Sequence, residues 1–122
     1  MNAKILSGAN LAFIGDAYYE LYIRHHLIKK GITNLDKLHK ETLKYVSRTS
    51  QTIIFNKLVK YLTEEEINIY KKGRNYHYKE RNEEYLSASG LEALIGYLYL
   101  SNLITHLEEI MELVIKLVEE NK

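Results

Sequence analysis

The chain contains no proline and only six glycines, so little in it would interrupt a helix. It also lacks runs of alternating β-branched residues, the pattern typical of a half-buried strand. Apolar residues instead recur at steps of three and four positions, which places them on one face of a helix. We therefore predict an all-α fold.

Start and stop signals divide this pattern into six expected helices. The first ends at Gly31, and Asn34 is placed to cap the second. On the first helix the expected apolar positions are Leu11, Ile14, Tyr18, Leu21, His25 and Ile28. On the second and third they are Leu35, Leu38, Leu43, Val46, Ile54, Phe55, Leu58 and Leu62.

Two capping boxes mark helix starts in the second half of the chain. Thr63 with Glu66 begins a short fourth helix, which we expect to end at Gly73. The fifth is expected from about residue 87 to 101, and Thr105 with its glutamate three positions later begins the last. The expected inward residues of these last two helices are Leu91, Leu94, Ile95, Leu98, Leu107, Ile110, Met111, Val114, Leu117 and Val118.

A chain of 122 residues with 46% hydrophobic content can form one compact core but not comfortably two, so we expect a single domain over residues 1–122. The absence of cysteine excludes disulfides and thiolate metal sites, and it favours a cytoplasmic setting. The apolar runs are far shorter than the roughly 20 residues of a membrane span, so no membrane partner is expected.

The net charge of +1 is too small to indicate nucleic-acid binding, but the charges are unevenly placed. The segment KKGRNYHYKER, from Lys71 to Arg81, holds five cations and one glutamate. We expect it to form a glycine-containing loop that wraps an RNA backbone, with Tyr76 and Tyr78 against sugars or bases. A solvated charged loop with no ligand is the alternative.

Asp16 lies inside the first expected helix, where aspartate has poor helix propensity. Small residues surround it, and similar residues surround Glu92 on the fifth helix; they are Ala12, Gly15, Ala17, Ala88, Gly90, Ala93 and Gly96. Because small residues let helix backbones approach closely, the two helices are expected to cross here and bring both carboxylates together. A solvated Asp16 on an exposed face is the alternative.

Converging carboxylates suit a hard divalent cation such as Mg²⁺, which binds oxygen ligands and often shares substrate phosphate. Such a cation activates water for phosphodiester hydrolysis. Glu20, one turn after Asp16, is a candidate to support this site, although a helix salt bridge with Arg24 is the stronger explanation of this residue.

Two motifs now carry a specific resemblance. FIGDAYYELYIRHHL resembles the signature helix of the ribonuclease III family, and LEALIGYLYL resembles its second acidic helix. RHHLIKKGI, LHKETLKYVS, SQTIIF, TEEE and KKGRN extend the likeness to compact members that lack a separate double-stranded RNA-binding domain. The resemblance implies an all-helical, dimeric, Mg²⁺-dependent endoribonuclease for double-stranded RNA.

By the same resemblance, Asp16 and Glu92 are the catalytic and metal-binding residues, and Phe13 lies in the dimer contact. The implied substrate is the base-paired ends of precursor large-subunit ribosomal RNA, and whether a ribosomal protein shapes that substrate stays open. The residues expected to contact RNA are Lys71, Lys72, Arg74, Asn75, His39, Arg48 and Gln51.

The sequence departs from the full-length family at two positions, where Ala12 and Ser89 replace acidic residues. Only two of four site carboxylates remain, so the number of metal ions is open and metal binding is expected mainly with substrate. A catalytically silent domain that binds structured RNA is the alternative. Retention of Asp16 and Glu92 favours the enzyme, because acidic groups beside phosphates weaken binding.

Overall fold

A computed structural model describes residues 1–120, and within that range the chain is helical without strands, which confirms the all-α prediction. The elements are η1 (Ala3–Ile5), α1 (Gly8–Lys29), α2 (Leu35–Val46), α3 (Arg48–Leu58), η2 (Val59–Tyr61), α4 (Glu64–Arg74), α5 (Glu83–Leu100) and α6 (Ile104–Glu119). None of these helices combines the length and apolar character needed to cross a membrane. Residues 121 and 122 of the expected domain lie outside the described range.

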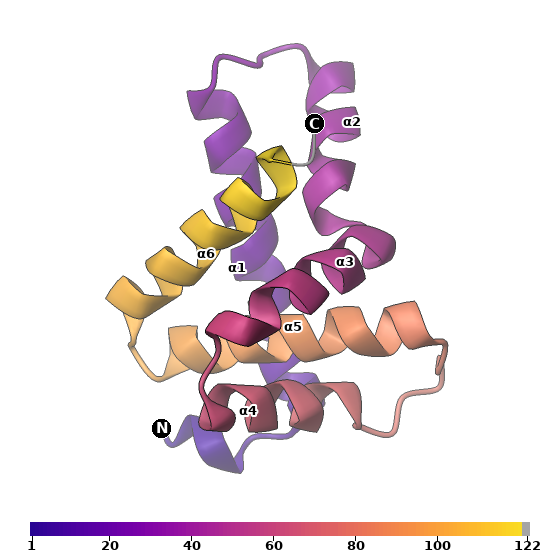
Figure 1. Cartoon of the computed structure of the whole chain (residues 1–122), viewed down its shortest axis with the longest axis vertical. Coiled ribbons are helices and arrows are strands. Elements are labelled where there is room, and N and C mark those ends of the chain that lie inside the picture. Colours follow the sequence, from indigo (N-terminus) through magenta and orange to yellow (C-terminus); the bar gives the residue numbers. More distant parts are fainter. Residues whose placement is uncertain (121–122) are drawn as a thin grey trace.

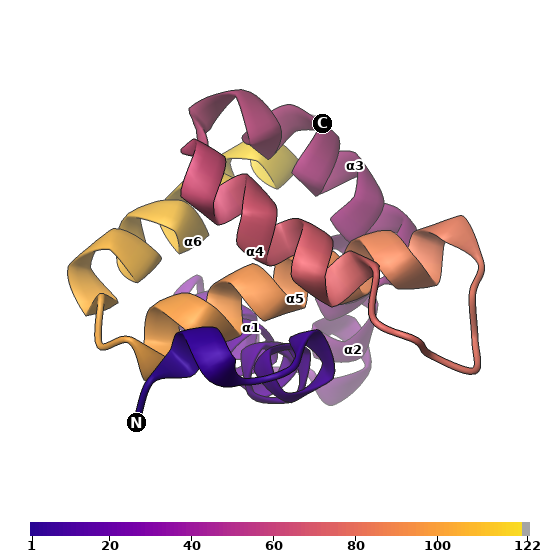
Figure 2. The same cartoon turned by 90° about the horizontal axis from the view of Figure 1, so that it is seen from below.

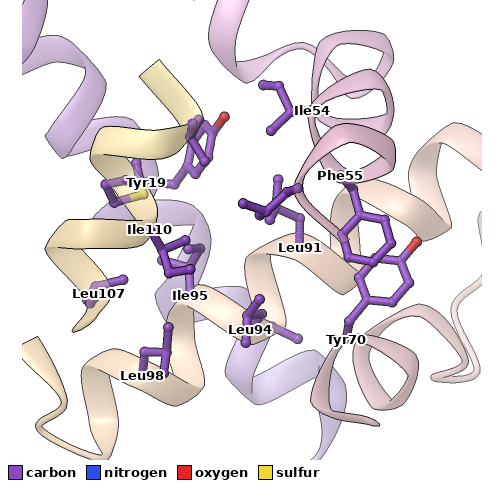
Figure 3. Packing of buried hydrophobic residues seen from close by; sticks show 14 of the residues in the cluster. Tyr19, Ile54, Phe55, Tyr70, Leu91, Leu94, Ile95, Leu98, Leu107 and Ile110 are labelled. Carbon is purple, nitrogen blue, oxygen red and sulfur yellow. The ribbon is translucent and has the colours of Figure 1, made fainter. Parts of the chain in front are cut away.

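Helix α5 packs against α1, α3, α4 and α6, whereas α2 packs against α1, α3 and α6 at the other end of the molecule (Figures 1 and 2). Every residue from 86 to 98 is buried except Glu92. The inward residues predicted for α5 are confirmed, and Figure 3 shows them between the apolar side of α6 and the stacked rings of Phe55 and Tyr70. A helix apolar on nearly all sides is stable only when enclosed in this way.

Helices α1 and α5 cross at their glycines (Figure 1). A β-carbon placed on Gly15 would lie 1.7 Å from the Glu92 carbonyl oxygen, and one on Gly96 would lie 1.9 Å from the Leu11 carbonyl oxygen. No side chain fits at either position without moving backbone. The close crossing predicted from the small residues is therefore confirmed.

Helix ends follow three of the predicted signals. Gly31 has φ +97° beyond the end of α1, a conformation that favours glycine. The Asn34 side chain accepts a hydrogen bond from the Lys37 backbone N–H, 3.0 Å, at the start of α2. The capping box of Thr63 and Glu66 is complete. These local rules worked because the groups involved are neighbours in sequence.

Three predicted helix boundaries were wrong. Helix α4 continues through Gly73 to Arg74, because Gly73 packs closely on α5, where an added β-carbon would lie 2.3 Å from Cβ of Ala93. Helix α5 begins earlier than expected, after the cap Asn82. Thr105 does not cap α6, since its neighbour His106 contacts Glu66 at 2.6 Å and the helix starts one residue earlier.

The predicted apolar face of α1 was correct at Leu11 and wrong toward the end of the helix. Leu21 and Ile28 are 67% and 58% exposed, and the buried large residues of α1 are Leu11, Tyr19, Ile23 and Leu27. Leu11 and Ile14 lie beside Gly96 of α5, whereas the predicted stripe leaves α5 further along the helix. On α2, likewise, Leu35 and Leu43 are exposed while Thr42 and Tyr45 are buried.

Candidate active site

The crossing of α1 and α5 brings the carboxyl groups of Asp16 and Glu92 together. Asp16 is exposed, whereas Glu92 is partly buried against α3. Burial raises the pKa of Glu92 to about 8, and both the charge of Asp16 and a hydrogen bond with it contribute. The two carboxyl groups therefore form one interacting pair at the surface end of a buried helix crossing.

The first turn of α3 supplies two further side chains to this pair. Ser47 caps the helix by accepting a hydrogen bond from the Ser50 backbone N–H, 3.1 Å. From that turn, the Gln51 amide donates to Oε2 of Glu92 at 3.4 Å, and the positive charge of Arg48 acts to lower the pKa of Glu92. Arg48 is exposed and its guanidinium lies 4.5 Å from the ring centroid of Tyr85. Arg48 is thus available to a phosphate beside the pair.

Gln51 differs from its predicted role. Its side chain is only 2% exposed and its amide faces Glu92, so it does not present a surface to RNA. Packing of α3 onto α5 turns Gln51 inward while Arg48 stays outside.

The donor set fits a hard divalent cation. Both groups are carboxyls, whose oxygens such a cation prefers, and burial together with the neighbouring Asp16 charge raises the pKa of Glu92, which a bound cation would lower. Within residues 1–120, no group of three or more His, Asp or Glu side chains is placed to hold a metal ion. The protein therefore offers two ligands, and water or substrate oxygens would complete the shell.

The positions around the pair are otherwise poor in acid. Ala12 and Ser89 are both buried. The Glu20 carboxylate accepts from Arg24 at 2.9 Å, which is the simple salt bridge that the spacing allowed. No described contact joins Glu20 to Glu92, so a supporting role for Glu20 at the metal stays a prediction.

Lys71, Lys72 and Arg74 lie in the last turn of α4 and not in a loop, which corrects the sequence prediction. The Lys72 ammonium donates to the Lys4 carbonyl oxygen at 2.7 Å, and Arg74 bridges to Glu83 at 2.6 Å. Lys71 is exposed, and Asn75 caps the end of the helix. The basic residues are therefore fixed in place on a helix end.

The loop of residues 75–82 projects from one end of the molecule (Figure 2). The rings of Tyr76 and Tyr78 in this loop form a row with the ring of Tyr85 on α5. The Tyr76 and Tyr78 centroids lie 4.9 Å apart, and those of Tyr78 and Tyr85 lie 5.3 Å apart. Tyr78 is partly buried and donates to the Gly73 carbonyl oxygen at 2.9 Å, so it shapes the loop. Sequence reasoning missed Tyr85, although it lies two helical turns before Glu92 on the same face.

Two predicted contact residues lie on open surface. Phe13 is 82% exposed on α1, one turn before Asp16, and His39 is exposed on α2. The dimer contact of Phe13 and the RNA contact of His39 stay predictions.

The helical fold and the pair of acidic residues match those of a known protein family. The family model for the ribonuclease III domain matches residues 9–103, and the chain therefore belongs to the ribonuclease III family. It is an endoribonuclease of this family, whose members act on double-stranded RNA and generally depend on a divalent metal.

Relatives that align along nearly the whole chain carry the name Mini-ribonuclease 3. The one from Clostridium tetani is 46% identical over 117 residues, covering 91% of this chain and 78% of the relative. The one from Streptococcus pneumoniae is 40% identical over 126 residues, covering 98% of each. A crystal structure of a Fusobacterium nucleatum protein is 36% identical, with a TM-score of 0.80 over 92% of this chain and 93% of that one.

Proposed function

We propose that the protein hydrolyses phosphodiester bonds in double-stranded RNA with Mg²⁺, and that it matures the base-paired ends of precursor 23S ribosomal RNA. The observation that carries the proposal is the meeting of Asp16 and Glu92 at the α1–α5 crossing, beside exposed Arg48. The resemblance of the two acidic motifs supports the ribosomal substrate.

Asp16 and Glu92 are the residues that would hold Mg²⁺, which when bound supplies activated water and charge stabilisation for the phosphate. Arg48 binds the backbone of the RNA beside them, since a guanidinium forms paired hydrogen bonds with phosphate. The buried α1–α5 crossing keeps the backbones that carry the two carboxyl groups at a fixed separation. No side chain of the pair needs to act as a nucleophile.

Cleavage assays test this function. Duplex RNA incubated with the protein and Mg²⁺ should be cut, while the same strands unpaired, or the duplex with EDTA, should stay intact. Precursor 23S RNA ends should be cut faster than an unrelated duplex of equal length. RNA binding without any cleavage would instead support the silent-domain alternative.

The three cations in the last turn of α4 should supply most of the electrostatic attraction between the protein and RNA. Alanine at Lys71, Lys72 and Arg74 should weaken duplex binding at all sequences and reduce its salt slope by roughly one per lost phosphate contact. Affinity measured from low to high salt checks this, with Lys116→Ala on acidic α6 as the matched control. Unchanged affinity in the triple variant would remove these residues from the RNA surface.

We further propose that two copies pair through Phe13 and that the catalytic domain includes α6, beyond residues 9–103. Buried Leu107, Met111 and Val114 attach α6 to the common core, which supports this extent. The lack of cysteine supports a cytoplasmic location. Sedimentation of the wild type and Phe13→Ser tests the pairing, and Mg²⁺-dependent activity without ribosomal protein tests whether a third partner is required.

A further inference from the structure

The amide of Gln51 is buried beside the site carboxylate. The side chain is 2% exposed, and its Nε2 lies 3.4 Å from Oε2 of Glu92. Gln51 comes from α3 and Glu92 from α5, so the contact joins two elements 41 residues apart in sequence. A buried amide is costly unless it has a partner, and Glu92 is the acceptor that the structure gives it.

The first turn of α3 determines where the Gln51 side chain points. At the start of the helix, the Ser47 hydroxyl accepts a hydrogen bond from the Ser50 backbone N–H and donates one to the Ser50 hydroxyl, which fixes the first turn. Arg48 and Gln51 are three residues apart on that turn, yet one is exposed and the other enclosed. The exposed cation is placed to meet substrate, and the enclosed amide can meet only the protein.

Glu92 needs such a restraint. It is the one residue between 86 and 98 that is not buried, and its side chain has several rotatable bonds. A donor fixed on one carboxylate oxygen removes part of that freedom, and groups that orient metal-binding carboxylates are strong determinants of metal affinity. A neutral amide does so without adding charge to the site.

We propose that Gln51 is a positioning residue, which holds the Glu92 carboxylate in the orientation that binds the cation, and that it does not contact RNA. This inference rests on the proposed function of the Asp16 and Glu92 pair.

Gln51→Met tests the proposal, because methionine has similar length and no N–H donor. We expect kcat to fall about 10- to 100-fold, with KM and duplex affinity in EDTA unchanged within about twofold. Mn²⁺ affinity of the protein–RNA complex, measured by the paramagnetic resonance signal of free Mn²⁺, should fall by a similar factor. Asn56→Ala, an exposed position on the same helix, is the control and should change neither quantity.

A second variant separates positioning from simple packing. Gln51→Asn keeps a buried amide that is one methylene too short, so it should show the same loss of Mn²⁺ affinity. In a Glu92→Gln background, Gln51→Met should cause no further loss. Thermal unfolding identifies any variant that fails to fold, in which case the asparagine variant decides.

Weaker RNA binding with kcat unchanged would overturn the proposal, as would normal Mn²⁺ affinity in both folded Gln51 variants. If Asp16→Asn still cleaves RNA, the proposed site itself fails. If Asp16→Asn is inactive while Gln51→Met is normal, only the inference about Gln51 fails.

Discussion

Glutamine in place of Glu92 is expected to abolish cleavage of duplex RNA and, in the same variant, to stabilise the metal-free protein at alkaline pH. The loss of activity should be at least about 1,000-fold in kcat, because the carboxylate is one of two protein ligands and metal-ion catalysis supplies several kcal/mol. Duplex binding in EDTA should remain, since the amide removes a negative charge near phosphate.

The stabilisation follows from the pKa of Glu92, which is about 8 in the folded protein against an ordinary value of 4.5. Between these two pKa values the unfolded chain has lost the proton while the folded protein still holds it, so rising pH favours unfolding over this range. Glutamine carries no such penalty. At pH 9 in EDTA the variant should therefore be more stable by several kcal/mol, and at pH 4 the two proteins should be nearly equal.

Urea unfolding in EDTA at both pH values measures this difference. Glu20→Gln is the matched control, because Glu20 is a carboxylate on the neighbouring helix that is held in a surface salt bridge. It should change stability by less than about 1 kcal/mol at either pH. Cleavage of RNA by the Glu92→Gln variant, or no increase in its free energy of unfolding at pH 9, would contradict the proposed carboxyl pair.

Alanine at Gly15 is expected to destabilise the protein by about 3 kcal/mol or more. The added methyl group would lie 1.7 Å from the Glu92 carbonyl oxygen, and an oxygen of helical backbone cannot move aside as a flexible side chain can. Helices α1 and α5 must separate, which takes Asp16 away from Glu92. Cleavage should therefore fall further than the loss of folded protein explains.

Gly31→Ala provides the comparison for this variant. Nothing lies within 4 Å of a β-carbon at Gly31, and only its φ of +97° opposes a side chain. We expect a cost of about 1 kcal/mol there and unchanged cleavage. Urea unfolding ranks the two variants, and equal costs would show that the crossing is looser than its glycines indicate.

The meeting of Asp16 and Glu92 could be predicted from sequence because it depends on size. Glycine and alanine beside both residues indicated a close crossing, and residue volume can be read without a structure. Residue size also explains why hydrophobicity alone did not predict which face of α1 is buried. Tyr19 is buried and Leu21 exposed because glycine contacts, rather than the largest apolar residues, set the rotation of α1.

The first part of the basic segment was predicted to lie in a loop, and this was wrong for a related reason. Gly73 was interpreted as the end of helix α4, but it allows close packing against α5. The helix therefore includes Arg74, which forms a hydrogen bond with Glu83. Gln51 was assigned to RNA by the family resemblance, whereas its acceptor in the structure, Glu92, lies 41 residues away in the sequence. Pairings over such distances follow from the tertiary packing of α3, α4 and α5.

The α1–α5 crossing also sets when a newly made chain becomes an enzyme. Asp16 and Glu92 are separated by 76 positions in the chain, and α1 has no partner for its glycine face until α5 has been synthesised. At about 5 to 20 residues per second, α1 waits roughly 4 to 15 s for that helix. A nascent chain that carries only the first acidic residue would lack half of the proposed cation site, so it would not cut the RNA of the ribosome that is making it.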